Sequence, residues 1–210
     1  MLDVLINFLP RFVTGLVVNF QMAVWSIAGG LLLALPLAYV RMEGGIAGKL
    51  SDGLVAVFRS APTFVLVFFL VNAVPSQFSV AGVSIQMTPW LAVVLALVVY
   101  GAAYLSDTGI EPLRELRQGS VVAALLYLMT AVRAFFMMVL SSCFGAAVGV
   151  VESVTVTLRT IENLPSVQDR LILIAVVIGI FTVCFQLIYW AIHKVRLTLT
   201  VRFARAGPSL

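Results

Sequence analysis

Two ionisable residues of opposite charge, Glu152 and Arg159, follow an apolar stretch of the sequence. They are seven residues apart, which places them near one face of a helix with 3.6 residues per turn. An ionisable pair within or beside membrane segments is by default a candidate for a transport pathway, and one charge of each sign suits a zwitterionic amino acid. The sequence therefore predicts Glu152 and Arg159 as substrate-pathway residues. The alternative, that both simply reach the outer membrane interface, remains open.

Other reactive residues are few. The two cysteines fall inside predicted membrane segments and are interpreted as packing residues, and the single histidine is His193. Metal binding and histidine-based catalysis therefore lack the necessary residues, and the sequence has no P-loop pattern for nucleotide hydrolysis. We expect no catalytic residue, no metal ligand and no cofactor bound by this chain, and we do not expect an enzyme.

The composition sets the class of protein. Apolar residues make up 62% and charged residues 10% of the 210 residues, against about 45–50% and about 25% in soluble domains. A chain of this size cannot hide that surplus in one core. The sequence predicts an integral membrane protein with an all-α, polytopic fold in a single domain.

Five membrane spans are predicted, at about residues 12–40, 54–75, 88–107, 134–151 and 171–193. The fourth is the difficult one, because Arg133 interrupts a long apolar run. A charge at the bilayer centre costs about 2.5–3.5 kcal/mol or more, so Arg133 is expected at the membrane edge. That choice leaves a separate apolar helix, at about 119–131, outside the membrane.

The basic residues predict the orientation. With five spans, ten of them fall on one side and three on the other, which places the first side in the cytoplasm and the N-terminus outside. The cytoplasmic group is Arg41, Lys49, Arg59, Arg114, Arg117, Arg133, Lys194, Arg196, Arg202 and Arg205, and the outer group is Arg11, Arg159 and Arg170. The basic C-terminal segment is interpreted as an anchor to lipid headgroups rather than a nucleic-acid site.

An apolar helix on the cytoplasmic side needs something to cover it. A groove on a partner protein would do so, and so would the membrane interface or continuation into a longer span. The residues alone do not separate these possibilities.

Several short motifs, in order, resemble the permease subunits of type I ABC importers for polar amino acids. They are "TGLVVNF" at 14–20, "FRSAP" at 58–62, "GAAYLSD" at 101–107, then Gly119, Ala123-Ala124, Phe135 and Val139-Leu140, and "LIYWAI" at 187–192. Each motif is weak alone, but the order and spacing are specific, and the likeness covers roughly residues 12–197.

The resemblance implies a set of partners. Such subunits pair as homodimers or heterodimers, receive an amino acid from a periplasmic binding protein, and dock a Glu-Ala-Ala loop on a cytoplasmic ATPase that uses ATP. It further implies a bacterial inner-membrane location and a coupling helix at about 119–131. The residues it assigns to ATPase coupling are Gly119, Val122, Ala123, Ala124, Leu126, Tyr127 and Phe135.

The sequence also departs from the family pattern. Val122 stands where the motif has its acidic residue, and Tyr127 or Leu128 stands where it has a helix-ending glycine. Loss of the acid removes a charge-assisted contact worth about 1.5–3 kcal/mol. The alternative function is therefore a divergent permease-like subunit that does not transport and has a structural or regulatory role in a membrane complex.

Arg59 and Pro62 lie at the cytoplasmic end of the second predicted span, directly before its most apolar run. The positive charge obeys the positive-inside bias, and the proline is expected in the first turns of the span, where a kink is tolerated. By analogy with the family, this inner end lines or gates the pathway, and Arg59 and Pro62 join Glu152 and Arg159 as pathway candidates. A plain membrane anchor is the alternative.

Overall fold

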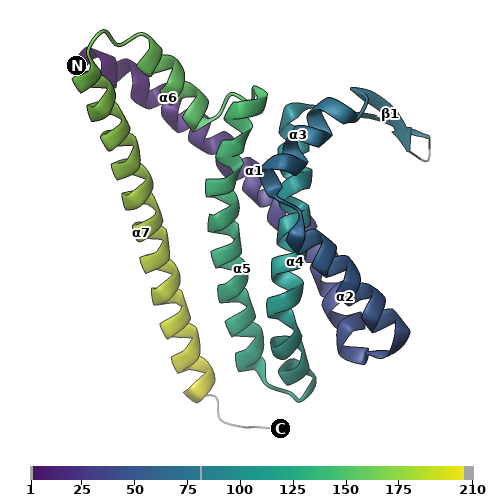
Figure 1. The fold of residues 1–210 in the computed structure, drawn as a ribbon. Coiled ribbons are helices and arrows are strands. Elements are labelled where there is room, and N and C mark those ends of the chain that lie inside the picture. The colour runs from purple at the N-terminus through teal and green to yellow at the C-terminus, as the bar shows by residue number, and fades with distance from the viewer. Residues whose placement is uncertain (1, 81, 206–210) are drawn as a thin grey trace.

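The structure is a computed structural model that describes residues 2–80 and 82–205, and it is largely helical (Figure 1). In chain order the elements are α1 (Leu2–Glu43), α2 (Gly45–Ser60), α3 (Thr63–Ala73), β1 (Gln77–Val80), β2 (Val83–Gln86), α4 (Pro89–Arg117), α5 (Val121–Ser141), the 3₁₀ helix η1 (Ser142–Val148), α6 (Ser153–Glu162) and α7 (Val167–Arg205).

Four helical segments are long and apolar enough to cross a membrane: Asp3–Glu43, Pro89–Arg117, Tyr127–Val148 and Val167–Val195. A fifth crossing results if α2 and α3 together count as one. The predicted polytopic, all-helical class is confirmed. The number of crossings and the side on which each terminus lies stay predictions.

Helix α1 is much longer than the span predicted at 12–40. Its 42 residues rise about 63 Å at 1.5 Å each, twice the thickness of the hydrocarbon core of about 30 Å. It therefore extends beyond the membrane or tilts within it, and Figure 1 shows it running obliquely to α5 and α7.

Small residues let α1 approach α4 closely. Ser26, Gly30 and Ala34 recur every four residues on one face of α1 and are buried. A Cβ atom on Gly30 would lie 3.3 Å from the backbone of Gly101 in α4, and the Ser26 hydroxyl donates a hydrogen bond to the Val94 carbonyl at 3.3 Å. Small residues favour this kind of helix packing in membranes, where van der Waals contact replaces the hydrophobic effect. The pair α1 and α4 forms the centre of the fold.

The span predicted at 54–75 is broken. Helix α2 ends at Ser60, α3 begins at Thr63, and the two helices meet at 88°. Pro62 has no N–H and pushes the residue before it out of the helical region, so Ala61 is extended, with φ −75° and ψ 115°. The prediction that Pro62 only kinks a continuous span is wrong.

The structure does not divide the region predicted as a coupling helix at 119–131 and a span at 134–151 into two helices between 131 and 134. Helix α5 runs without interruption from Val121 to Ser141, because that stretch contains no glycine or proline to end it. The break lies earlier, at the end of α4. There Gly119 has φ 90°, its N–H bonds to the Leu116 carbonyl, and the Ser120 N–H bonds to the Glu115 carbonyl, each at 3.0 Å. This Schellman motif turns the chain from α4 into α5.

A hairpin of β1 and β2 follows α3, which the all-α prediction did not include. The strands pair antiparallel, with Val80 opposite Val83. The alternation of polar and apolar residues in "QFSV" and "VSIQ", with Gly82 between them, is a hairpin signal in the sequence.

The opposite end of the molecule is organised by α6, which lies against the first turns of α1 (Figure 1). Phe8 and Phe12 of α1 pack with Leu164, Leu173 and Val177 in a small apolar core. The closest approach is at Gly15, where an added Cβ would lie 2.6 Å from the Ser153 nitrogen. Only glycine fits there without moving the backbone of α6.

We predict opposite effects for two glycine-to-alanine changes within helices. Gly15→Ala should lower the melting temperature of the detergent-purified protein, because overpacking against backbone costs about 1–3 kcal/mol. Gly53→Ala, whose Cβ would meet nothing within 4 Å, should leave it unchanged or raise it, since alanine is favoured over glycine in a helix by about 1 kcal/mol. Equal increases for both variants would contradict the close approach of α1 and α6.

Candidate functional site

Four polar regions bear on function: two ion-pair clusters, one tight turn and one buried knot of hydrogen bonds. We call the end that holds the α1–α2 and α4–α5 turns the inner end, following the predicted orientation, and the end that holds α6 the outer end.

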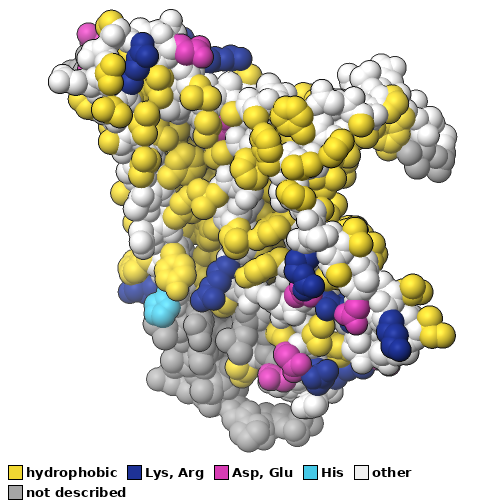
Figure 2. Space-filling view, in the orientation of Figure 1, with side chains coloured by type: hydrophobic (Ala, Val, Ile, Leu, Met, Phe, Trp, Pro, Cys, Tyr) yellow, Lys and Arg dark blue, Asp and Glu magenta, His cyan; other side chains and the backbone are white. Residues whose placement is uncertain are grey.

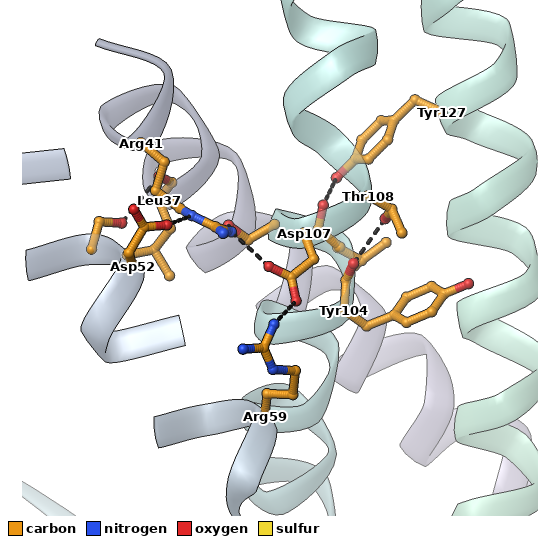
Figure 3. A network of polar contacts seen from close by, with 11 residues as sticks. Leu37, Arg41, Asp52, Arg59, Tyr104, Asp107, Thr108 and Tyr127 are labelled. Carbon is orange, nitrogen blue, oxygen red and sulfur yellow. Dashed lines mark hydrogen bonds and ion pairs between the residues drawn. The ribbon is translucent and has the colours of Figure 1, made fainter. Parts of the chain in front are cut away.

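The first cluster joins α1, α2 and α4 at the inner end (Figure 3). Arg41 of α1 binds Asp52 of α2 at 2.6 Å and Asp107 of α4 at 2.8 Å, and its guanidinium also donates to the Ser106 hydroxyl at 3.1 Å. Arg59 of α2 reaches the second oxygen of Asp107 at 3.0 Å. Two arginines and two aspartates therefore neutralise one another, with Asp107 shared between both cations.

Arg59 thus has a structural partner that the sequence analysis did not identify. Its side chain is 65% exposed but is paired with Asp107, whereas that of Arg41 is 12% exposed. Asp107 closes the quoted motif "GAAYLSD" and received no role. The pairing fastens the end of α2 to α4 directly before the break at Pro62.

The second cluster holds the last turns of α1 and α4 together. Arg117 binds Glu43 at 2.6 Å, and its guanidinium lies 4.6 Å from the centre of the Tyr39 ring. Both contacts lie at the start of the α4–α5 turn, so they fix where that turn leaves the inner end.

The α4–α5 turn itself is exposed. Gly119 is exposed and supplies the positive φ, and Val122, in the first turn of α5, is 57% exposed. The backbone of Ala123, Ala124 and Leu126 is helical, but their side chains lie outside those that the structure describes. Among the residues of the predicted coupling set whose exposure the structure describes, Gly119 and Val122 are the exposed ones.

Two residues of the predicted coupling set face inward. The Tyr127 hydroxyl donates to the Leu105 carbonyl at 3.2 Å, and its ring packs at Gly109 of α4. Phe135 lies against Phe20 of α1, with ring centres 5.9 Å apart. Because α5 is one continuous helix, Phe135 is about 20 Å along it from the turn. The structure does not group Tyr127 or Phe135 with Gly119 and Val122.

At the outer end, Glu152 is fully buried in a knot of hydrogen bonds. Its carboxylate caps α6 by accepting from the N–H groups of Val154 at 2.9 Å and Thr155 at 2.8 Å. It also accepts from the Asn19 amide of α1 at 3.0 Å, and the same amide donates to the Ser142 hydroxyl at 2.8 Å. A carboxylate with this many donors is bound to the fold rather than free for a ligand.

Glu152 and Arg159 are not a charge pair in the structure. Glu152 is buried at the start of α6, whereas Arg159 is exposed, has no carboxylate partner among residues 2–80 and 82–205, and lines a cavity together with Arg11. A spacing of seven residues does not bring these two side chains together, because Glu152 precedes α6 and its side chain caps the start of that helix.

The sequence and fold resemble amino-acid permeases. The glutamine transport system permease protein GlnP of Escherichia coli K12 is 27% identical over 100 residues, which cover 47% of this chain and 44% of that protein. The probable amino-acid permease protein YxeN of Bacillus subtilis is 26% identical over 150 residues, covering 70% of this chain and 64% of that protein. No family model matches the chain.

A solved structure shows the same fold. The crystal structure of an amino acid ABC transporter with histidines superposes with a TM-score of 0.66 and 16% identity, covering 94% of this chain and 96% of that one.

Together these findings confirm the predicted resemblance to permease subunits of amino-acid ABC transporters, which are transporter components rather than enzymes. With its apolar helices, the chain is a multi-pass protein of the bacterial inner membrane. The matched regions cover less than two thirds of either sequence relative.

The knot around Glu152 makes a testable prediction. Glu152→Gln replaces one carboxylate oxygen, which accepts hydrogen bonds, with an NH2 group, which donates them. The donors that now bind that oxygen, from Asn19 or the backbone of α6, would lose their acceptor, and each buried group left without a partner costs about 1–3 kcal/mol. The melting temperature should fall clearly. The control Glu162→Gln, an exposed residue of the same helix, should change it little. A similar, small change in melting temperature for both variants would show that the hydrogen bonds around Glu152 do not stabilise the fold.

The ion pairs at the inner end should contribute unequally to the stability of the protein. Arg41→Ala removes a largely buried cation from two carboxylates and should destabilise the protein by about 3 kcal/mol, the lower limit for breaking a buried pair. Arg59→Ala should cost about 0–1 kcal/mol because that side chain is mostly exposed. Arg114→Ala, which breaks an exposed i,i+3 pair with Glu111, is the control. Thermal unfolding in detergent measures how much stability each variant loses. A larger loss of stability for Arg59→Ala than for Arg41→Ala would contradict the prediction.

Proposed function

We propose that the chain is a membrane-spanning subunit of an ATP-driven ABC importer that takes up a polar amino acid. The observation that carries this proposal is the likeness to amino-acid permeases in both sequence and fold, the latter over 94% of the chain. ATP is used by a separate ATPase subunit, a second permease subunit completes the pathway, and a periplasmic binding protein delivers the solute.

The α4–α5 turn is the proposed docking point for the ATPase. It is exposed, its position is fixed by the Arg117–Glu43 ion pair, and it presents the apolar Val122 to its surroundings. An exposed apolar side chain at the rim of a membrane protein suits a groove on a partner. Where the family motif has an acid, this chain offers apolar contact, and burying a valine contributes about 1.5–3 kcal/mol.

Fewer residues are candidates for contact with the solute than the sequence suggested. Glu152 is held by its hydrogen bonds and Arg59 by Asp107. We therefore assign both to positioning of helices rather than to contact with the solute. Pro62 keeps a role in the pathway only as the break that separates α2 from α3.

Val122→Arg tests the docking point. Removing the apolar contact and placing an unpaired charge there should weaken association with a co-expressed ABC ATPase at least tenfold, since 1.4 kcal/mol is a factor of ten. The measurement is co-purification in detergent together with amino-acid uptake in proteoliposomes. The matched control is Ile46→Arg, which puts the same charge on an 81% exposed residue at the α1–α2 turn.

Three outcomes are informative. Loss of both association and uptake in Val122→Arg alone supports the proposal. If the wild-type chain binds the ATPase but adds nothing to uptake, the chain is the non-transporting subunit that the altered motif allows. If the wild-type chain binds no ABC ATPase, the proposed function is wrong.

A further inference from the structure

A cavity of about 740 Å³ lies at the outer end, between the first turns of α1 and α6. Phe8, Val151 and Leu164 form part of its apolar wall. The polar side chains that line it are Asn7, Arg11 and Thr14 of α1, Arg159 and Thr160 of α6, and Asn163 directly after α6. The cavity is therefore built by two helices that are far apart in the sequence and held together at Gly15.

The charge of this cavity is not balanced. Arg11 and Arg159 line it, and neither has a carboxylate partner among the described residues 2–80 and 82–205. At the inner end Arg41, Arg59 and Arg117 each bind a carboxylate.

The acidic groups of the outer end are accounted for. Glu152 accepts hydrogen bonds from the backbone of α6 and from Asn19, and the remaining carboxylates, those of Asp3, Glu162 and Asp169, do not line the cavity. Arg11 and Arg159 therefore give this cavity two positive charges and no negative one, which favours an anion.

The other polar groups of the cavity can accept hydrogen bonds. The Asn7 amide donates to the Asp3 carbonyl and the Asn163 amide to the Arg159 carbonyl, and the Thr14 and Thr160 hydroxyls donate to carbonyls of their own helices. Both hydroxyl protons and one N–H of each amide are used in these bonds, so the amide and hydroxyl oxygens remain as acceptors beside the second N–H of each amide. The cavity thus combines guanidinium donors with neutral acceptors.

We propose that this cavity is an oxyanion-binding site in which Arg11 and Arg159 clamp a carboxylate or phosphate group while the neighbouring amide and hydroxyl oxygens accept from hydroxyl or ammonium groups of the same molecule. Guanidinium groups match such oxyanions through paired hydrogen bonds. The oxyanion comes either from a small acidic solute or from the phosphate of an anionic lipid in the outer leaflet. The site does not depend on the proposed transport function.

The test is a ligand-induced shift in melting temperature of the purified chain in neutral detergent. The free-anion arm uses glutamate and inorganic phosphate against chloride at equal ionic strength. The lipid arm uses phosphatidylglycerol against phosphatidylcholine. At about 100 times the dissociation constant, a bound ligand should raise the melting temperature by about 5–10 °C.

The variants locate the effect. Arg11→Gln combined with Arg159→Gln should abolish the shift, and Arg11→Lys combined with Arg159→Lys should retain part of it, because charge remains but the paired hydrogen bonds do not. Arg133→Gln, which removes the same charge from the groove between α5 and α7, should keep the full shift.

A shift in only one arm identifies the source of the oxyanion. The proposal is overturned if neither arm shifts the wild-type chain, or if the double glutamine variant keeps the wild-type shift. Because no ATPase is present, failure here is distinct from failure of the proposed transport function.

Discussion

The structure depends on one constraint: inside a membrane, every polar side chain must find its partner within the protein. Among the described side chains, no buried nitrogen or oxygen atom lacks a hydrogen-bond partner. Two clusters provide such partners for charged side chains: the hydrogen bonds between Asn19 and Glu152 at the outer end, and the ion pair of Arg41 with Asp107 at the inner end. Both fasten α1 to another helix, and between them small residues bring α1 against α4. The long first helix is thus held near its middle, at Asn19, and near its C-terminal end, at Arg41.

This constraint distinguishes charged side chains that hold helices together from charged side chains that are free to bind a ligand. Glu152, Asp107 and Arg41 are bound to neighbouring helices, so they position elements rather than meet a solute. Figure 2 shows the same division on the surface: charged side chains gather at the two ends, and apolar ones cover the helices between them. What the helices hold in place is the α4–α5 turn at one end and the arginine-lined cavity at the other. Those are the surfaces on which a transport subunit would meet its partners.

The sequence predicted the class of fold because composition and apolar run length report directly on the membrane. It could not predict the break at Pro62 as a right-angled bend, since a proline in an apolar run permits either a kink or an end, and tertiary contacts decide. A charge such as Arg133 predicts a membrane edge but not a helix end, because helix continuity depends on the backbone, and α5 continues through it. The pairings of Arg59 with Asp107 and of Glu152 with Asn19 join residues 48 and 133 positions apart. No local pattern contains that information.

If the start of α5 lies at the cytoplasmic side and docks on an ATPase, as we propose, Val122 should be reachable from that side alone. The most direct measurement uses Val122→Cys in a background in which Cys143 and Cys184 are replaced by alanine. Inside-out and right-side-out membrane vesicles are treated with a membrane-impermeant maleimide, with and without the co-expressed ATPase. We expect labelling in inside-out vesicles alone, and protection from labelling when the ATPase is present. Labelling from the outer side, or no labelling in either kind of vesicle without the ATPase, would contradict it.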